Sequence, residues 1–116
     1  MNIERLRTYC LELDNVQEEL PFGPDTLVFK VSGKIFLLLN LEAHPLQFNV
    51  KCDPEYALEL RERYPNAVFP GYHMNKRHWN TILASSEFSD QQLLRFVEES
   101  YTLVCSKLPK KHRNST

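Results

Sequence analysis

The amino-acid sequence predicts an α+β fold: a single compact domain in which helices pack on an antiparallel sheet. The chain has 116 residues, which is enough for one ordinary domain and too few for two. Helical and alternating hydrophobic patterns follow one another in the order helix, several strands, helix, hairpin and helix. This order shows neither strict β-α alternation nor an internal repeat, so a parallel sheet or a solenoid is not expected.

The N-terminal segment predicts a helix followed by a short strand. Apolar residues recur at helical spacing over residues 3–13, behind Asn2, which is a good N-cap residue. Residues 16–20 are expected to form a strand. Pro, Gly and Asp at 21–25 then predict a turn.

The next three segments predict the centre of the sheet. Residues 26–31 alternate in polarity, and residues 35–41 are almost wholly apolar, so the pair is expected to form a hairpin around Ser32-Gly33. Residues 46–50 also alternate, which predicts a strand with one face on the core and one facing solvent.

Two further helices have clear start signals. Asp53-Pro54-Glu55 combines an N-cap, a first-turn proline and a first-turn acid, and the helix that follows is expected to end before Pro65. Ser89 and Gln92 form a capping-box pattern ahead of a periodic segment that reaches Leu108. The last helix is therefore expected to run for about twenty residues.

Between these helices the sequence predicts a second hairpin. Residues 67–70 are interpreted as a connection. Residues 72–75 and 79–83 are expected to be its two short strands, joined by a turn at Lys76-Arg77.

Charge is nearly balanced overall but unevenly distributed. The net charge is -1. Residues 1–60 carry five Lys or Arg against ten Asp or Glu, and residues 61–116 carry nine against five, giving -5 and +4. The near-neutral total argues against strong nonspecific binding to nucleic acid, although a dipolar surface can still attract it locally.

Several sequence features indicate a cytoplasmic protein. Cys10, Cys52 and Cys105 are odd in number and lack C-x-x-C spacing, so neither a disulfide framework nor a zinc site is expected. The N-terminus does not have the pattern of a signal peptide. The longest apolar run, residues 35–39, is far shorter than the ~20 residues that span a bilayer, so we expect no membrane partner.

The most informative segment is residues 71–81, G-Y-H-M-N-K-R-H-W-N-T, which we call the signature segment. It concentrates cationic, aromatic and amide side chains. Lysine and arginine contact phosphate, asparagine can read a base edge, and aromatic rings can stack on bases. The composition is typical of a recognition surface.

With Pro70 in front, the signature segment resembles the most recognisable stretch of the MmcQ/YjbR family of small bacterial proteins. The similarity covers nearly the whole chain, including the turn Phe22-Gly23-Pro24, the segment V-K-C-D-P-E at 50–55 and the closing residues 99–104 and 108–110. The resemblance implies a CyaY/frataxin-like fold, with a family domain at 1–109 and a basic, polar tail at 110–116. It also implies DNA binding through two β-hairpin "wings".

In that binding mode, the turn Ser32-Gly33-Lys34 and the turn at Lys76-Arg77 would be the two wings. We therefore expect duplex DNA as the partner of a monomeric protein. Lys30 and Lys51 would widen the basic patch if their side chains are exposed. The predicted nucleic-acid-binding residues are Lys34, His73, Asn75, Lys76, Arg77 and His78.

The signature segment also has a structural interpretation. Trp79 and Tyr72 would cover the sheet, Met74 would fill the core, and Asn75 and His78 would hydrogen-bond the backbone. For Trp79 we favour the core over base stacking. For Lys76 and Arg77 we favour solvent, because adjacent cations are rarely buried.

Other functions were weighed against DNA binding. The chain lacks a Gly-rich phosphate loop and the common catalytic motifs, so we expect neither an enzyme nor a cofactor. A small-molecule or protein-binding module is the alternative, with a pocket bounded by Tyr72, His73, Trp79 and Phe22. The frataxin-like resemblance raises iron binding. Ordinary solvated carboxylates are the preferred interpretation of the acidic residues involved, which are Glu12, Asp14, Glu18 and Glu19.

Overall fold

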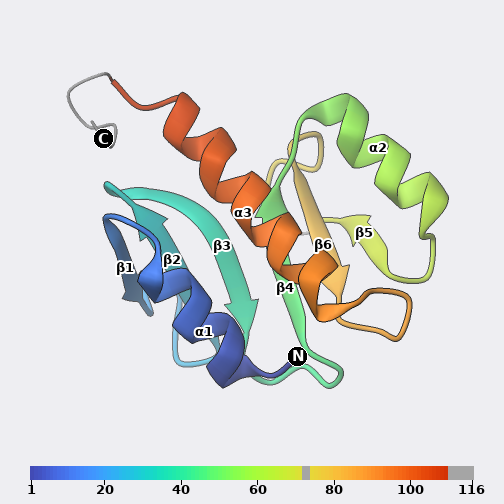
Figure 1. Cartoon of the computed structure of the whole chain (residues 1–116), viewed down its shortest axis with the longest axis horizontal. Coiled ribbons are helices and arrows are strands. Elements are labelled where there is room, and N and C mark those ends of the chain that lie inside the picture. Colours follow the sequence, from blue (N-terminus) through green and yellow to red (C-terminus); the bar gives the residue numbers. More distant parts are fainter. Residues whose placement is uncertain (72–73, 110–116) are drawn as a thin grey trace.

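A computed structural model describes residues 1–71 and 74–109. It contains three helices and a six-stranded antiparallel sheet with strand order β1-β2-β3-β4-β6-β5 (Figure 1). The α+β class and the single compact domain predicted from the sequence are confirmed. The elements in chain order are α1 Ile3–Glu12, β1 Val16–Glu19, β2 Thr26–Val31, β3 Lys34–Asn40, β4 Gln47–Lys51, α2 Pro54–Arg63, β5 Val68–Pro70, β6 Trp79–Leu83 and α3 Asp90–Ser106.

The helix starts follow the local capping signals. Asn2 accepts a hydrogen bond from the Arg5 amide at 2.8 Å, and Asp53 accepts one from the Glu55 amide at 3.1 Å. Ser89 and Gln92 form both hydrogen bonds of the capping box. These contacts satisfy amide groups that have no partner inside the helix, so the predicted starts are confirmed.

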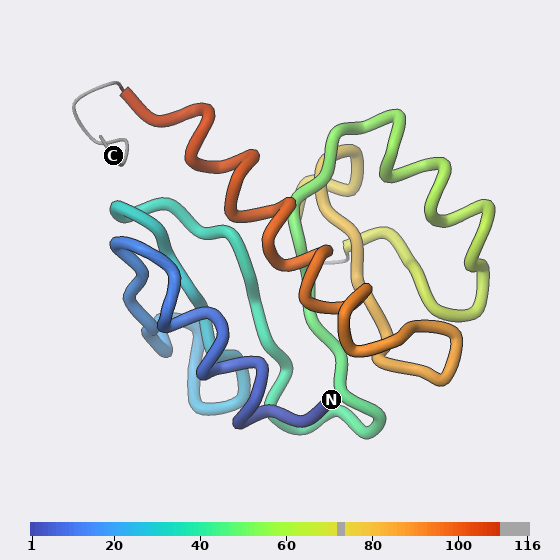
Figure 2. Tube along the Cα trace, in the orientation of Figure 1, coloured from blue at the N-terminus to red at the C-terminus, as the bar shows by residue number. Residues whose placement is uncertain are grey.

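One face of the sheet carries the main hydrophobic core. Helix α3 crosses the middle of this face and α1 packs beside it (Figures 1 and 2). Apolar side chains at alternate strand positions, such as Phe29, Leu37 and Phe48, are fully buried there. The buried faces of the helices supply Leu6, Cys10, Leu93, Val97 and Val104.

The opposite face of the sheet has a second, smaller cluster. Val28, Leu38 and Trp79 are buried together, and Ile35 and Met74 pack against them. Trp79 is only 6% exposed. The core interpretation of Trp79 and Met74 therefore describes their observed positions better than base stacking does.

A bulge in β3 meets the middle of α3. Phe29 pairs with Leu37 and Lys30 with Ile35, which leaves Phe36 as the extra residue. The buried hydroxyl of Ser100 donates to the Phe36 carbonyl at 2.6 Å and accepts from the Lys51 amide at 2.8 Å. One side chain of α3 thus satisfies backbone groups of both β3 and β4.

The second hairpin differs from its prediction. Residues Val68–Pro70, interpreted from the sequence as a connection, form strand β5 and pair with β6. The predicted strand 72–75 is wrong for its described part, because Met74 and Asn75 lie outside the ladder; Tyr72 and His73 lie outside the described residues. The predicted strand 79–83 and the turn at Lys76-Arg77 are confirmed.

Close packing explains why the chain leaves the ladder at Gly71. The Gly71 amide donates to the Trp79 carbonyl at 2.9 Å, which is the last contact of the hairpin. A Cβ atom at Gly71 would lie 3.0 Å from Trp79 Cβ. Only glycine fits such a close approach without displacing the tryptophan.

Candidate nucleic-acid interface

The turn at Asn75–His78 presents the most exposed part of the signature segment. Asn75, Lys76 and Arg77 are exposed, whereas His78 is half-buried. The side chain of Asn75 accepts a hydrogen bond from the Arg77 amide at 2.9 Å, and its carbonyl accepts from the His78 and Trp79 amides at 3.1 and 2.9 Å. Asn75 therefore shapes the turn, as in the structural interpretation of this residue.

Helix α2 holds this turn from behind through Arg61. Its guanidinium donates to the Lys76 carbonyl, to the Trp79 carbonyl at 3.3 Å and to Asn80 Oδ1 at 2.6 Å. Asn80 is fully buried and also donates to the Ala57 carbonyl at 3.2 Å. The turn is thus fixed to α2 as well as by the hydrogen bonds among its own residues.

The backbone of His78 extends the sheet toward the turn. Its carbonyl accepts from the Cys52 amide at 2.6 Å, one residue beyond the Lys51–Trp79 pair of β4 and β6. Thr81, also in the signature segment, donates to Asn49 Oδ1 at 2.6 Å on the face opposite the helices. Most described residues of the segment therefore take part in the structure of the hairpin, and Lys76 and Arg77 are exposed cations on its turn.

The other predicted wing is the β2–β3 turn. Ser32 and Gly33 both have positive φ angles, 48° and 84°, which lets two residues connect the strands. Lys34 follows as the exposed first residue of β3. This hairpin is confirmed as predicted.

The two turns lie at the same end of the sheet. Register places the starts of β3 and β6 at this end, because Leu37 pairs with Val50 and Lys51 with Trp79. Strand β4 separates them, so the two strands are roughly 10 Å apart across the sheet. In Figure 1 the β2–β3 turn lies at the left, where β2 meets β3, and β6 begins further to the right, beside α3.

Lys30 and Lys51, which were expected to widen the basic patch, differ in their position and in their ion pairing. Lys51 is half-buried at the end of β4, between the two turns. Lys30 forms an ion pair with Glu19 at 3.2 Å, which offsets its charge. Only Lys51 lies where it could join a surface shared by Lys34, Lys76 and Arg77.

Acidic residues lie close to the β2–β3 turn. A hollow beside the turn is lined by Ser32 and Gly33 together with Glu12 at the end of α1 and Asp14 in the α1–β1 connection. The negative charge of these carboxylates repels a phosphate group and so disfavours its binding at this turn. The Asn75–His78 turn is therefore the stronger cationic element of the two.

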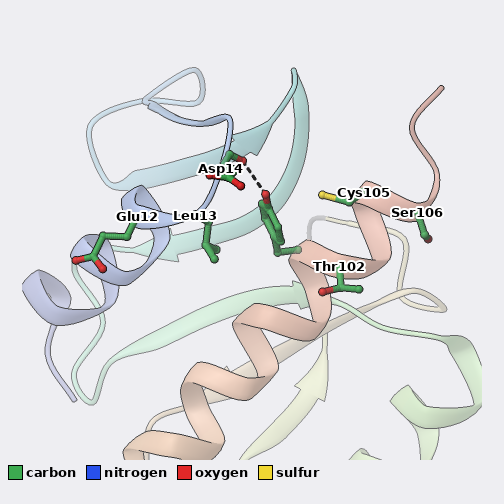
Figure 3. Close-up of a pocket in the computed structure, with 7 residues that line it drawn as sticks. Glu12, Leu13, Asp14, Thr102, Cys105 and Ser106 are labelled. Carbon is green, nitrogen blue, oxygen red and sulfur yellow. Dashed lines mark hydrogen bonds between the residues drawn. The ribbon is translucent and has the colours of Figure 1, made fainter. Parts of the chain in front are cut away.

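Another hollow, of about 510 Å³, lies between the C-terminal ends of α1 and α3 (Figure 3). The Tyr101 hydroxyl donates to the Asp14 carbonyl at 2.7 Å across it. Burial, followed by the neighbouring Cys105 thiol, raises the pKa of Tyr101 to about 12. This contact fastens the two helix ends together, and we assign it a structural role.

The described residues do not assemble the aromatic pocket of the alternative function. Phe22 is 65% exposed in the β1–β2 turn, next to the start of β2. Through the register, that end of the sheet is the end of β6 at Leu83, whereas the buried Trp79 begins β6 at the other end. Phe22 and Trp79 therefore do not face a common site.

The acidic residues weighed for iron do not converge either. Glu18 pairs with Arg7 and Glu19 pairs with Lys30, and these neighbours on β1 point to opposite sides of the sheet. Residues 1–71 and 74–109 contain no group of three or more side chains arranged to hold a metal ion. The same ranges contain no helix long and apolar enough to cross a membrane.

Sequence analysis missed Arg61 and Ser100 as organisers of the site. Arg61 was one of several charged residues on α2, and its partner Asn80 lies 19 positions away. Ser100 bonds to a carbonyl 64 positions away. The pattern of polar residues along each helix carries no signal for such distant partners.

Comparison with known proteins identifies the family. The family model YjbR matches residues 11–103. The uncharacterized protein YbdF of Escherichia coli O157:H7 is 39% identical over 93% of this chain and 88% of its own length. The uncharacterized protein YjbR of Escherichia coli K12 is 26% identical over 97% of this chain and 95% of its own length.

Solved structures agree with these relatives. The crystal structure of Deinococcus radiodurans DR2400, which carries the family-model domain DUF419, has a TM-score of 0.91 and 35% identity, covering 96% of this chain and 84% of that one. A crystal structure of a Pseudomonas syringae protein has a TM-score of 0.75 and 26% identity, covering 89% and 98%. In sequence and in fold, this chain belongs to the YjbR family.

Proposed function

We propose that this protein is a non-enzymatic DNA-binding module whose main contact with duplex DNA is the Asn75–His78 turn. The observation that carries the proposal is a pair of adjacent exposed cations, Lys76 and Arg77, on a turn that Arg61 and Asn75 hold in place. A pre-formed cationic turn loses little conformational entropy when it binds phosphate.

The second contact is Lys34 on the β2–β3 turn, at the same end of the sheet. The strand spacing puts the two turns on one surface, with Lys51 between them. In this arrangement Lys34, Lys76 and Arg77 contact phosphates, while Asn75 and His78 shape the turn. The contacts position the protein on the duplex without reading its sequence.

Charge limits the affinity that this site can reach. The net charge of -1 gives no long-range attraction to DNA. Three phosphate contacts would make the logarithm of the binding constant fall with the logarithm of salt concentration with a slope of about -3. Binding is therefore expected to be weak at physiological salt.

We also propose that the protein is a cytoplasmic monomer, in keeping with the free thiols of Cys10, Cys52 and Cys105.

The test is fluorescence anisotropy of a labelled duplex, titrated with protein at about 50 and about 200 mM salt. The K76A/R77A variant should lose most of the binding and reduce the salt slope by about 2. The matched control is R63A/R95A, which removes the same charge from exposed positions away from the turn. Equal affinities for the two double variants, or no binding by the natural sequence at low salt, would refute the proposal.

A further inference from the structure

A cavity of about 330 Å³ opens between the N-terminal end of α2 and the middle of α3. It lies at the end of β4, in the V-K-C-D-P-E segment, of which the DNA-binding proposal uses only Lys51. Its walls come from three parts of the chain. The lining residues are Lys51, Cys52, Asp53, Tyr56, Phe96, Glu99 and Leu103.

The floor of the cavity is apolar and neutral. Cys52 and Phe96 are 7% and 8% exposed, and Leu103 is half-buried beside them. Burial, with the nearby Glu99 carboxylate next in importance, raises the pKa of the Cys52 thiol to about 12. The thiol is therefore protonated at neutral pH and adds no charge to the floor.

Two polar groups at the cavity have no hydrogen-bond partner among residues 1–71 and 74–109. No hydrogen bond or ion pair joins the Glu99 carboxylate or the Tyr56 hydroxyl to another residue in the parts of the chain that the structure describes. Asp53 differs, because its carboxylate already caps α2 through the Glu55 amide. Burial raises the pKa of Glu99, against the opposing effect of Arg95, and also raises the pKa of Tyr56.

We propose that this cavity binds a small organic ammonium ion that has an apolar body. The Glu99 carboxylate pairs with the ammonium group, the Tyr56 hydroxyl accepts one of its hydrogens, and Phe96 and Leu103 contact the apolar part. A cavity of this size with an apolar floor and a few converging polar groups is typical of small-molecule sites. The cavity adjoins the surface of the cationic turns at Lys51, but the proposed contacts with the ammonium ion do not depend on DNA binding.

The electrostatic reason for this ligand class is the Glu99 carboxylate, which lines the cavity and belongs to an exposed residue that burial removes only in part from water. An anion that has lost some hydration and has no hydrogen-bond partner gains more from a cation than a fully solvated one does. An aromatic ring beside it favours a cation with an attached apolar group. A neutral analogue gains only the apolar contacts.

The test follows backbone amide NMR signals of the full chain during titration with benzylamine. Benzyl alcohol and benzoate, which carry the same ring without the positive charge, are the comparison probes. Shifts in residues 51–56 and 96–103 that saturate with benzylamine, and are much smaller with the other two probes, are expected. No saturable shift, or equal binding of benzyl alcohol, would overturn the proposal.

A matched pair of variants tests whether the carboxylate that binds benzylamine is that of Glu99. E99Q removes the proposed carboxylate and should weaken benzylamine binding about tenfold, a change of about 1.4 kcal/mol. E98Q removes the same charge one position away, where Glu98 accepts from the Tyr9 hydroxyl at 3.0 Å, and should leave the affinity unchanged. Equal weakening by both variants would contradict a specific role for Glu99. E99Q should fold normally, because Glu99 has no hydrogen-bonded partner to lose within the described residues.

Discussion

Arg61 Nε donates a hydrogen bond to Asn80 Oδ1 at 2.6 Å, which joins α2 to the second residue of strand β6. Asn80 is fully buried and its amide group also reaches the Ala57 carbonyl. A single cationic side chain therefore donates to a buried amide oxygen, to the Lys76 carbonyl in the turn and to the Trp79 carbonyl at the start of β6. Several predictions rest on such long-range contacts between polar groups.

The R61A variant should be destabilised by about 1–3 kcal/mol, because it leaves Asn80 Oδ1 and the Lys76 carbonyl without the donor that Arg61 supplies. Urea unfolding followed by circular dichroism measures this change. The control is R63A, which removes only an exposed pair with Glu59 and should cost less than about 0.5 kcal/mol. Equal losses for both variants would contradict the proposed role of Arg61.

The S100A variant should also lose about 1–3 kcal/mol of unfolding free energy. Without the hydroxyl, the Phe36 carbonyl and the Lys51 amide lose their common partner in the interior. T102A, at an exposed position of the same helix, is the control and should change stability little. A neutral S100A substitution would show that the bulge can satisfy these groups in another way.

Trp79 should behave as a core residue. W79A is expected to destabilise the protein by about 3–5 kcal/mol, and W79F by clearly less. Because Trp79 is the single tryptophan, its fluorescence in the natural sequence should be shifted to short wavelength and quenched poorly by acrylamide. A thermal melt unaffected by W79A would instead indicate an exposed ring that is available for stacking.

The ion pair between Arg7 and Glu18 should make stability depend on pH. The hydrogen bond from Arg7 is the main cause that lowers the folded-state pKa of Glu18 below its ordinary value of 4.5. A lowered pKa means that the stabilisation is fully present above pH 4.5 and is lost as the pH falls through the folded-state value. Since the Arg7 side chain is 50% exposed, solvent screens the pair and the gain in stability should be small.

The measurement for this pair compares the unfolding free energies of the natural sequence and R7Q between neutral and acidic pH. The difference should be constant above the ordinary Glu18 pKa and should shrink below it. E18Q should remove the same pH-dependent difference. A gap between R7Q and the natural sequence that grows on acidification would have the wrong sign for this mechanism.

Much of the fold could be predicted from local patterns. The starts of the three helices follow from Asn2, Asp53 and Ser89, because an N-cap side chain bonds to amides only two or three residues away. Alternation of apolar residues predicted β2, β3 and β4, because successive side chains of a strand point to opposite faces. The basic turn at Lys76-Arg77 was predicted for a similar reason, since adjacent cations avoid the interior.

Strand β5 could not be predicted in this way. Val68–Pro70 is three residues long and contains a proline, so neither alternation nor strand propensity distinguishes it from a loop. Its pairing with β6 exists because the edge of the sheet is available there. The glycine that ends the pairing is explained only by the closeness of Trp79.

The sequence by itself thus determined the α+β class, most element boundaries, the second hairpin's turn and the membership implied by the signature segment. Tertiary structure alone decided which residues of that segment face solvent, that Arg61 fixes its turn to α2, and that Ser100 joins β3 to β4. It also decided that Glu99 and Tyr56 line one cavity. The physical reason is the distance along the chain over which each interaction acts. Capping and periodicity act over a few residues, whereas burial and long-range hydrogen bonds depend on which distant elements the fold brings together.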